Sequence, residues 1–360
     1  MKKFTKTFTT ALVALTSLAM IGCSSFGSKP EGDQMKALES SPQFKGDKFG
    51  NVPPTVDTME MGMFALLWEF LFKSRKPSEP LPSVKPVFAS TLTADQLNVY
   101  WLGHSTLIIE TGGKRFITDP IFGSASPFSF LMTRLQPAPI AFEELPEIHG
   151  VLISHDHYDH LEMPTVKKFA AKGVPFFVPL GVGSHLRGWG VSEDLINEMD
   201  WWDEKVLDGV TIACTPSRHF SGRGLSDGNS TLWSSWSIIG DKKRFFYSGD
   251  TAYSPHFKAI GEKYGPFDIA AMENGAYNEN WSDVHLFPEQ SVQASLEVQA
   301  KAMIPVHWGM YDLALHDWFE PIKRAVQHGD KIGANVLTPQ IGQTIRLEEK
   351  SVLSRWWGML

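Results

Sequence analysis

The sequence contains very little cysteine. Only two of its 360 residues are cysteine, Cys23 and Cys214, and Cys23 lies at the end of an N-terminal leader. The mature chain therefore has no pair of cysteines from which to form an internal disulfide. In an oxidising compartment, where disulfides normally persist, its fold must be held together by packing or by metal ions.

The chain also lacks an excess of basic residues and a second long apolar run. Lys and Arg number 33 against 40 Asp and Glu, for a net charge of −7, and no basic stripe is present, which argues against a nucleic-acid partner. Past the leader, no apolar run reaches the roughly 20 residues that span a bilayer. The apolar content of 42% and charged content of 20% are ordinary for a globular protein of one large domain or two small ones.

The first 22 residues are typical of a secretory signal peptide. A basic start (MKKFTK) precedes the apolar run of residues 11–21. The segment ends in AMIGCS, in which a small residue followed by Cys23 resembles a bacterial lipobox. The resemblance implies that Cys23 is lipidated, and Ser24 at the next position favours the outer membrane. We therefore expect a membrane-anchored lipoprotein of the bacterial cell envelope with a periplasmic domain; an ordinary cleaved signal is the alternative.

Residues 23–90 are expected to form an N-terminal extension. Residues 24–58 are rich in Ser, Gly, Pro and Lys and lack periodicity, which predicts a tether. The segment 59–72 (MEMGMFALLWEFLF) predicts an apolar helix that is too short to span a bilayer. Packing of this helix on the domain is the favoured interpretation, and an interfacial helix that dips into lipid is the alternative.

Residues 91–360 are expected to form the main folded domain, with an α/β fold. Two β-rich halves, each finishing with helices, suggest two sheets packed face to face with helices outside, a four-layer αβ/βα sandwich. The expected strands are 99–109, 115–119, 151–153, 174–178, 210–214, 233–239, 244–247, 268–272, 303–306, 336–338 and 344–347. The expected helices are 164–172, 256–264, 288–300 and 317–328.

The segment 154–160 (SHDHYDH) carries the strongest chemical signal. Imidazole and carboxylate are ligands that Zn²⁺ binds. His155 and His157 can point to one side of a tight turn, whereas Asp159 and His160 can serve a neighbouring position. One ion cannot comfortably take all four ligands from so short a segment, so the spacing predicts two metals. A polar surface loop that is rich in histidine is the alternative.

Further candidates stand at the ends of later strands, namely His219, Asp250 and His307. With them, the chain resembles metallo-β-lactamase-fold hydrolases, and within these it is similar to the N-acylphosphatidylethanolamine-hydrolysing phospholipase D family over roughly residues 98–345. The segments that carry the similarity are 102–106 (LGHST), 119–120 (DP), 154–160, 217–220 (SRHF), 248–251 (SGDT), 265–268 (GPFD), 275–277 (GAY) and 306–309 (VHWG).

The resemblance implies a site for two Zn²⁺ ions, although Fe and Mn also suit such ligands. The first ion would be held by His155, His157 and His219, and the second by Asp159, His160 and His307, with Asp250 bridging both. The resemblance also implies that Asp119 orients a ligand imidazole from beneath the cluster. His104 either lines the site or is a structural histidine.

Two zinc ions about 4 Å apart can share a hydroxide that attacks phosphorus. The leading hypothesis is therefore a phospholipase D-type phosphodiesterase acting on N-acylphosphatidylethanolamine-like lipids. A metal-dependent lactonase, or another ester or amide hydrolase, is the alternative, and a partner-binding lipoprotein without catalysis is a third. The expected catalytic residues are Asp159, Asp250 and His285, and the expected substrate contacts are Tyr277 and Arg218, with Arg223 as a further candidate; His285 and the arginines could instead be surface residues.

Overall fold

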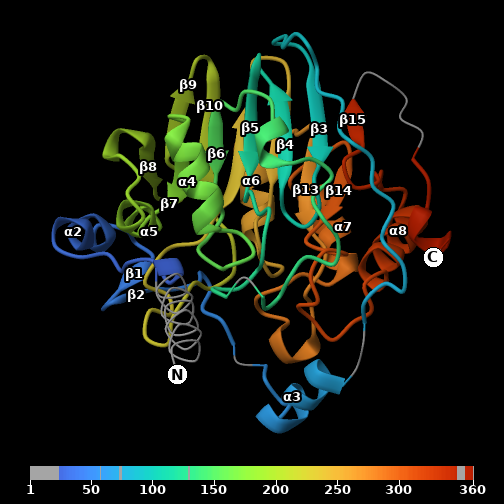
Figure 1. Ribbon diagram of the computed structural model, residues 1–360, viewed down its shortest axis with the longest axis horizontal. Helices are drawn as coiled ribbons and strands as arrows, with labels where there is room; N and C mark the ends of the chain where they lie inside the picture. Colours follow the sequence, from blue (N-terminus) through green and yellow to red (C-terminus); the bar gives the residue numbers. More distant parts are fainter. Residues whose placement is uncertain (1–23, 57, 73–74, 129, 347–352, 360) are drawn as a thin grey trace, which may run out of the picture.

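The computed structural model describes residues 24–360 apart from residues 57, 73–74, 129, 347–352 and 360. The expected signal peptide (1–22) and Cys23 lie outside the described residues. Figure 1 shows the strands of the sheets running roughly vertically, with the helix α3 set apart below them and α8 at the right.

Two mixed sheets form the centre of the fold. The first has seven strands in the order β15-β3-β4-β5-β6-β7-β8, and the second has six in the order β14-β13-β12-β11-β10-β9. Parallel pairing joins β5 through β8 in the first sheet and β12 through β14 in the second. The strands of the first sheet are β3 (Leu97–Trp101), β4 (Leu107–Thr111), β5 (Lys114–Thr118), β6 (Gly150–Leu152), β7 (Phe176–Pro179), β8 (Ile196–Met199) and β15 (Thr344–Arg346). Those of the second are β9 (Glu204–Leu207), β10 (Val210–Thr215), β11 (Ser235–Ile239), β12 (Arg244–Tyr247), β13 (Ile269–Glu273) and β14 (Met303–Val306).

The helices of the described residues are α2 (Asp33–Glu39), α3 (Met63–Phe72), α4 (Met163–Ala171), α5 (Gly183–Gly188), α6 (His256–Tyr264), α7 (Pro288–Glu297) and α8 (Glu320–Ile332). Short 3-10 helices occupy η1 (Phe142–Glu144), η2 (Glu193–Leu195), η3 (Glu279–Trp281) and η4 (Trp356–Met359). The apolar clusters place α4 and α5 against the first sheet and α6, α7 and α8 against the second.

Side-chain alternation along the strands separates the inner core from the outer ones. In β4, Leu107 and Ile109 lie in the core between the sheets, where they share a cluster with Ile212 of the second sheet. Ile108 between them lies in the outer cluster with Val166 of α4, as the two-residue period of a strand requires. The predicted four-layer αβ/βα sandwich is therefore confirmed.

Several predicted elements have different bounds. The strand expected over 99–109 is two antiparallel strands, β3 and β4, because Gly103 and His104 adopt positive φ angles of 98° and 52° and turn the chain. The strand expected over 336–338 is only a bridge between Val336 and Met303. By contrast, β12, α6 and β14 begin and end at the predicted residues.

The N-terminal extension is not the tether that composition predicted. It forms α2 and the small hairpin of β1 (Phe44–Lys45) and β2 (Lys48–Phe49). Leu38, Phe44 and Phe49 are buried in the same cluster as the core between the sheets, and the N–H of Phe49 donates to the carbonyl of Asn229. Three widely spaced apolar residues give no periodic pattern, so only contacts with distant segments reveal that this stretch is folded.

The helix α3 forms within the expected segment 59–72, but one face of it does not pack on the domain. Phe64, Trp68 and Phe72 are 89%, 60% and 64% exposed, and their spacing of four residues places them on one side. A helix packed on the domain and an interfacial helix that dips into lipid would both leave a face exposed, so both interpretations stay predictions. Among the described residues no helix has the length and apolarity to cross a membrane.

Candidate metal centre

The candidate ligands gather at one edge of the two sheets. The segment 154–160 follows β6, His219 follows β10, Asp250 follows β12 and His307 follows β14 directly. His104 joins them from the turn between β3 and β4, where its carbonyl accepts a hydrogen bond from the N–H of His307. Side chains that are up to about 200 positions apart in the chain thus meet because strand ends of both sheets meet.

Three imidazoles form the first half of the site, which we call the histidine trio (His155, His157 and His219). Nδ1 of His157 lies 2.8 Å from Nε2 of His155 and 3.2 Å from Nε2 of His219. All three offer a nitrogen within 4.8 Å of the others. Three converging imidazole nitrogens are a common ligand set for a zinc ion that keeps a further position open.

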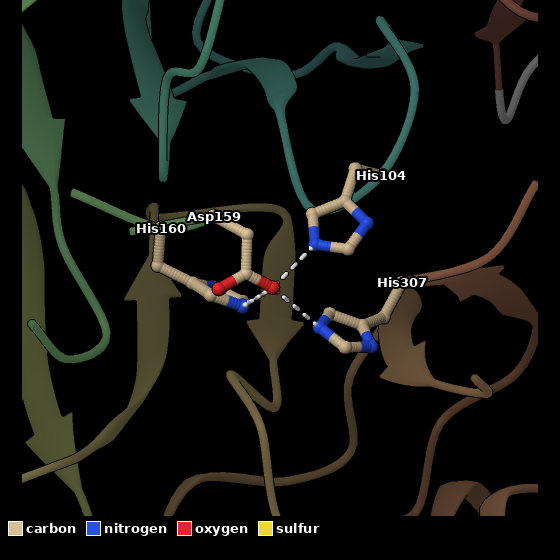
Figure 2. Close-up of side chains that lie close together, drawn as sticks. All are labelled: His104, Asp159, His160 and His307. Carbon is tan, nitrogen blue, oxygen red and sulfur yellow. Dashed lines mark hydrogen bonds and ion pairs between the residues drawn. The ribbon is translucent and has the colours of Figure 1, made fainter. Parts of the chain in front are cut away.

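The second half is the aspartate group (His104, Asp159, His160 and His307), shown in Figure 2. Oδ2 of Asp159 lies 2.9 Å from Nε2 of His104, 3.2 Å from Nε2 of His307 and 3.3 Å from Nε2 of His160. One carboxylate oxygen therefore faces three imidazoles. His104, which the sequence left between two roles, lies directly in the cluster.

Asp250 contacts both halves of the site. Its Oδ2 lies 3.0 Å from Nε2 of His307 and 3.2 Å from Nε2 of His160 in the aspartate group. The same oxygen lies 3.8 Å from Nε2 of His219 and 3.9 Å from Nε2 of His155 in the trio. Asp250 is thus the carboxylate placed to bridge two ions.

The donor set fits two divalent cations. Among the described residues, Oδ1 of Asp250 is buried without a hydrogen-bond partner, and Nε2 of His160 faces only the carboxylate oxygens of Asp159 and Asp250, at 3.3 and 3.2 Å. A buried polar atom left unpaired costs about 1–3 kcal/mol, and a coordinated cation would satisfy such an atom. Imidazole with carboxylate suits Zn, Fe and Mn.

The two halves differ in charge. Burial lowers the pKa of His155 and His219 well below the usual imidazole range. Burial also disfavours the charged form of His160 and His307, but nearby carboxylates, Asp250 first, outweigh it and raise the pKa of His160 well above its usual value and that of His307 to about 10. Burial would raise the pKa of Asp250, yet His160 and His307 hold it well below the usual range.

Asp119 holds the aspartate group from beneath. Its Oδ2 accepts hydrogen bonds from Nδ1 of His160 at 2.7 Å and from the hydroxyl of Ser154 at 2.6 Å, and also from the Tyr247 hydroxyl. Its Oδ1 accepts from the N–H of Ser154 at 2.7 Å. With Nδ1 of His160 donating to Asp119, Nε2 is the nitrogen left for an ion.

Glu273 was missed by sequence reasoning. It is fully buried at the end of β13, where Oε1 shares a hydrogen bond with Nδ1 of His285 and Oε2 accepts one from the N–H of Thr251 at 2.6 Å. The His285 ring lies 5.0 Å from that of His219. A glutamate that ends an otherwise apolar strand (IAAME) was the available signal.

Asn51 of the N-terminal extension was missed as well. Its amide Nδ2 donates to the carbonyl of His219 at 2.7 Å, and its Oδ1 accepts from the N–H of His219 at 3.2 Å and from Nε1 of Trp233 at 3.0 Å. Nδ1 of His219 faces the carbonyl of Val284 at 2.8 Å. The extension thus fixes the backbone of a trio residue, and no local pattern around Asn51 indicates this.

The arginines expected to meet substrate are engaged with protein groups. Arg218 is buried, donates to both carboxylate oxygens of Asp283 at 2.9 and 2.6 Å, and donates to the carbonyls of residues 53–54. Arg223 is buried and donates to the carbonyl of Ser25. The expectation for Arg218 as a substrate contact stays a prediction, and the structure shows its charge paired with Asp283.

Tyr277 is also engaged with protein groups. Its hydroxyl donates to Oε1 of Glu320 at 2.8 Å, its ring stacks on His316 with centroids 4.4 Å apart, and the Arg324 guanidinium lies 5.0 Å from its ring centre. The side chain is buried and ties the loop after β13 to α8. Its expected role as a substrate contact stays a prediction beside this structural role.

Comparisons with known proteins show which family this chain resembles in sequence. A family model described as Beta-lactamase superfamily domain matches residues 114–308. A Mycobacterium tuberculosis protein of uncharacterized function is 39% identical over 89% of this chain and 88% of its own length. The Caenorhabditis elegans N-acyl-phosphatidylethanolamine-hydrolyzing phospholipase D 1 is 37% identical over 67% of this chain and 75% of its own length.

Two further similarities concern location and fold. The Klebsiella pneumoniae outer membrane protein RomA is 46% identical over 28% of this chain and 76% of its own length. The solved structure of Igni18, a metallo hydrolase from Ignicoccus hospitalis, covers 71% of this chain and all of its own with a TM-score of 0.56 at 20% identity. At that identity the likeness speaks for the fold alone.

Proposed function

The chain belongs to the β-lactamase superfamily of metallo-hydrolases, and on that premise we propose that it is a two-zinc phosphodiesterase with a phospholipase D-type reaction on N-acylphosphatidylethanolamine-like lipids. The observation that carries the proposal is the joint presence of the histidine trio, the aspartate group and Asp250 in a chain 37% identical to a relative named for that hydrolysis. In this reaction water adds to phosphorus, the bond from phosphorus to the headgroup oxygen breaks, and the headgroup leaves as an alcohol.

The protein's residues hold and orient the reacting groups. The trio would hold one ion, Asp159, His160 and His307 the other, and Asp250 would contact both. When bound, two divalent ions supply an activated water and positive charge beside the phosphoryl oxygens. Asp119 keeps Nε2 of His160 directed at its ion through the hydrogen bond to Nδ1.

His285 is the residue placed to serve the leaving group. Glu273 binds Nδ1 of His285, so Nε2 is the ring nitrogen available to substrate. It would take up a proton that the attacking water releases and pass that proton to the departing oxygen. Burial lowers the pKa of His285 to about 4, so the ring is neutral at pH 7 until the negative charge of a bound phosphodiester favours its protonation.

We also propose that the protein is an envelope lipoprotein, anchored through Cys23 in the outer membrane with a periplasmic catalytic domain. The leader and the residues AMIGCS support this location, as does the similarity to an outer membrane protein.

The test is hydrolysis by zinc-loaded protein of N-acylphosphatidylethanolamine in mixed micelles, measured as phosphatidic acid released. We expect Asp250→Ala to lower the rate on the order of 10³-fold, since it removes the carboxylate common to both ions. Asp241→Ala, at an exposed turn position, is the matched control and should leave the rate unchanged. Turnover of lactones or amides with no turnover of any phosphodiester would overturn the proposal.

A further inference from the structure

The exposed face of α3 is unusual for a helix at the surface of a soluble domain. Phe64, Trp68 and Phe72 form an aromatic row, in which the rings of Trp68 and Phe72 lie 4.2 Å apart. Glu69 is the only ionisable residue of the helix, and its carboxylate pairs with the buried guanidinium of Arg75 at 2.9 Å. The row therefore carries no charge. Contiguous exposed apolar surface of this kind marks an interaction site.

Hydrogen bonds fix α3 relative to the metal centre. The N–H groups of Glu60 and Met61, just before the helix, donate to Oδ1 of Asn280 at 3.1 and 2.8 Å. Asn280 belongs to η3, in the loop that leads to His285. At the other end, the N–H of Trp318 donates to the carbonyl of Arg75. The aromatic row is thus held at a defined place beside the site.

The start of the described chain is bound beside the same site. The carbonyl of Ser24 accepts from Nε1 of Trp189 at 2.7 Å, and the carbonyl of Ser25 accepts from Nη2 of Arg223 at 2.7 Å. Nη1 of Arg223 donates in turn to the carbonyl of Asp156, between His155 and His157. An anchor on Cys23 would therefore be joined to the chain one residue from a segment fixed to the ligand loop.

An apolar loop lies next to the start of the described chain. A cavity of about 490 Å³ is lined by Ser25, Phe128 and Tyr158 among other residues. Beyond Phe128 the same loop exposes Leu131 and Met132 by nearly half. Apolar side chains therefore stand near the expected anchor as well as on α3. In Figure 1 the helix α3 lies at the bottom of the view, and α2, β1 and β2 lie above it and to its left.

We propose that the aromatic row of α3 and a lipid anchor joined to the bound segment 24–28 dock the protein onto a lipid bilayer. Trp and Phe beside an uncharged surface favour the boundary between headgroups and acyl chains, and the segment that would carry the anchor is bound through Arg223 to the ligand loop. The protein would then be attached to the membrane at two points, each tied by hydrogen bonds to a loop of the metal centre. The inference extends the proposed function, because a lipid phosphodiester lies in that membrane, but vesicle binding is measurable whether or not the chain hydrolyses lipid.

The experiment uses the mature chain, residues 23–360, with Cys23→Ser so that no acyl group contributes. Sedimentation with phosphatidylethanolamine–phosphatidylglycerol vesicles compares this protein with the triple variant Phe64→Ser, Trp68→Ser, Phe72→Ser. The matched control is Val206→Ser, Leu296→Ser, Ile332→Ser, three exposed apolar residues on β9, α7 and α8. We expect the α3 variant to bind vesicles at least tenfold more weakly and the control to bind as the parent does.

A second readout places the row at the lipid. A polarity-sensitive dye on Phe64→Cys should shift to the blue with vesicles, whereas the same dye on Val206→Cys should not; Cys214 is buried and does not compete for the dye. Hydrolysis of a soluble short-chain phosphodiester should be equal in the parent protein and the α3 variant.

Two outcomes would overturn the proposal. One is equal vesicle binding by the α3 variant and the control variant. The other is a parent protein that is a dimer and an α3 variant that is a monomer, because a second copy of the chain would then cover the aromatic row.

Discussion

The histidine trio and the aspartate group lie side by side, but they are held and charged in different ways. The trio contains no carboxylate, and burial keeps its imidazoles His155 and His219 neutral. The aspartate group and Asp250 pair carboxylates with imidazoles whose pKa values are raised. The trio is therefore ready to accept a cation, whereas the aspartate group must first release protons.

The supports of the two halves also come from different parts of the chain. Asp119, directly after β5 of the first sheet, binds His160 in the loop that follows β6 of the same sheet. Asn51 binds His219 from an extension that lies outside both sheets. The difference shows that one half of the site is a property of the sandwich, and that the other depends in addition on the segment before it.

The largest effect should come from removing one ligand from each half. His219→Ala should lose the ion of the trio and His307→Ala that of the aspartate group, each leaving about one ion per chain. Activity should fall on the order of 10³-fold in both variants, because each ion neutralises charge at the reacting phosphate. Elemental analysis after gel filtration counts the ions. Loss of both ions from either single variant would contradict two separable halves.

A smaller and more selective effect should follow from changing the supports. Asn51→Ala should weaken the ion of the trio by about 10–100-fold, and Asp119→Asn that of the aspartate group by a similar factor, since each removes the group that orients a ligand. Competition with a chelator gives both affinities, and the His307→Ala background assigns the affinity of the trio. The two variants are controls for each other. If both weaken the same ion, the assignment of supports is wrong.

The smallest effect should appear in the protons released on metal binding. The pKa of His307 is raised to about 10 and that of His160 lies well above its usual value, so at pH 7 both carry a proton that a cation must displace. Affinity in the aspartate group should therefore rise with pH up to about 10. The pKa values of His155 and His219 are lowered, so affinity in the trio should change little above pH 7. Calorimetry in buffers of different ionisation enthalpy measures the number of protons released for each ion bound. Equal release from the trio and the aspartate group would contradict the difference in charge between them.

Much of the fold and of the ligand set could be predicted from the sequence. Strands such as β12 and β14 are short apolar runs with polar residues at their ends, and helix α6 begins and ends where its apolar period does. The segment 154–160 brings several metal-binding side chains together through covalent spacing alone. Such signals are local, so they survive without knowledge of the fold.

Other parts depend on contacts between segments far apart in the chain. Glu273 reads as the polar end of a strand until His285 and Thr251 are seen to bind it. Arg218 reads as a cation available to an anionic substrate, and only the fold brings Asp283 and the carbonyls of residues 53–54 to it. The role of a side chain depends on its partner, and the local sequence pattern does not show partners that lie far away in the chain.

By itself the sequence determined the four-layer class and the residue types that can hold metal at the site, because periodicity and spacing are local properties of a chain. The tertiary structure decided that His104 lies within the aspartate group, that residues 38–51 are folded onto the domain, and that the aromatic row of α3 faces outward. The physical reason is the same in all three. Burial and pairing depend on which distant segments meet, and only the packed chain brings them together.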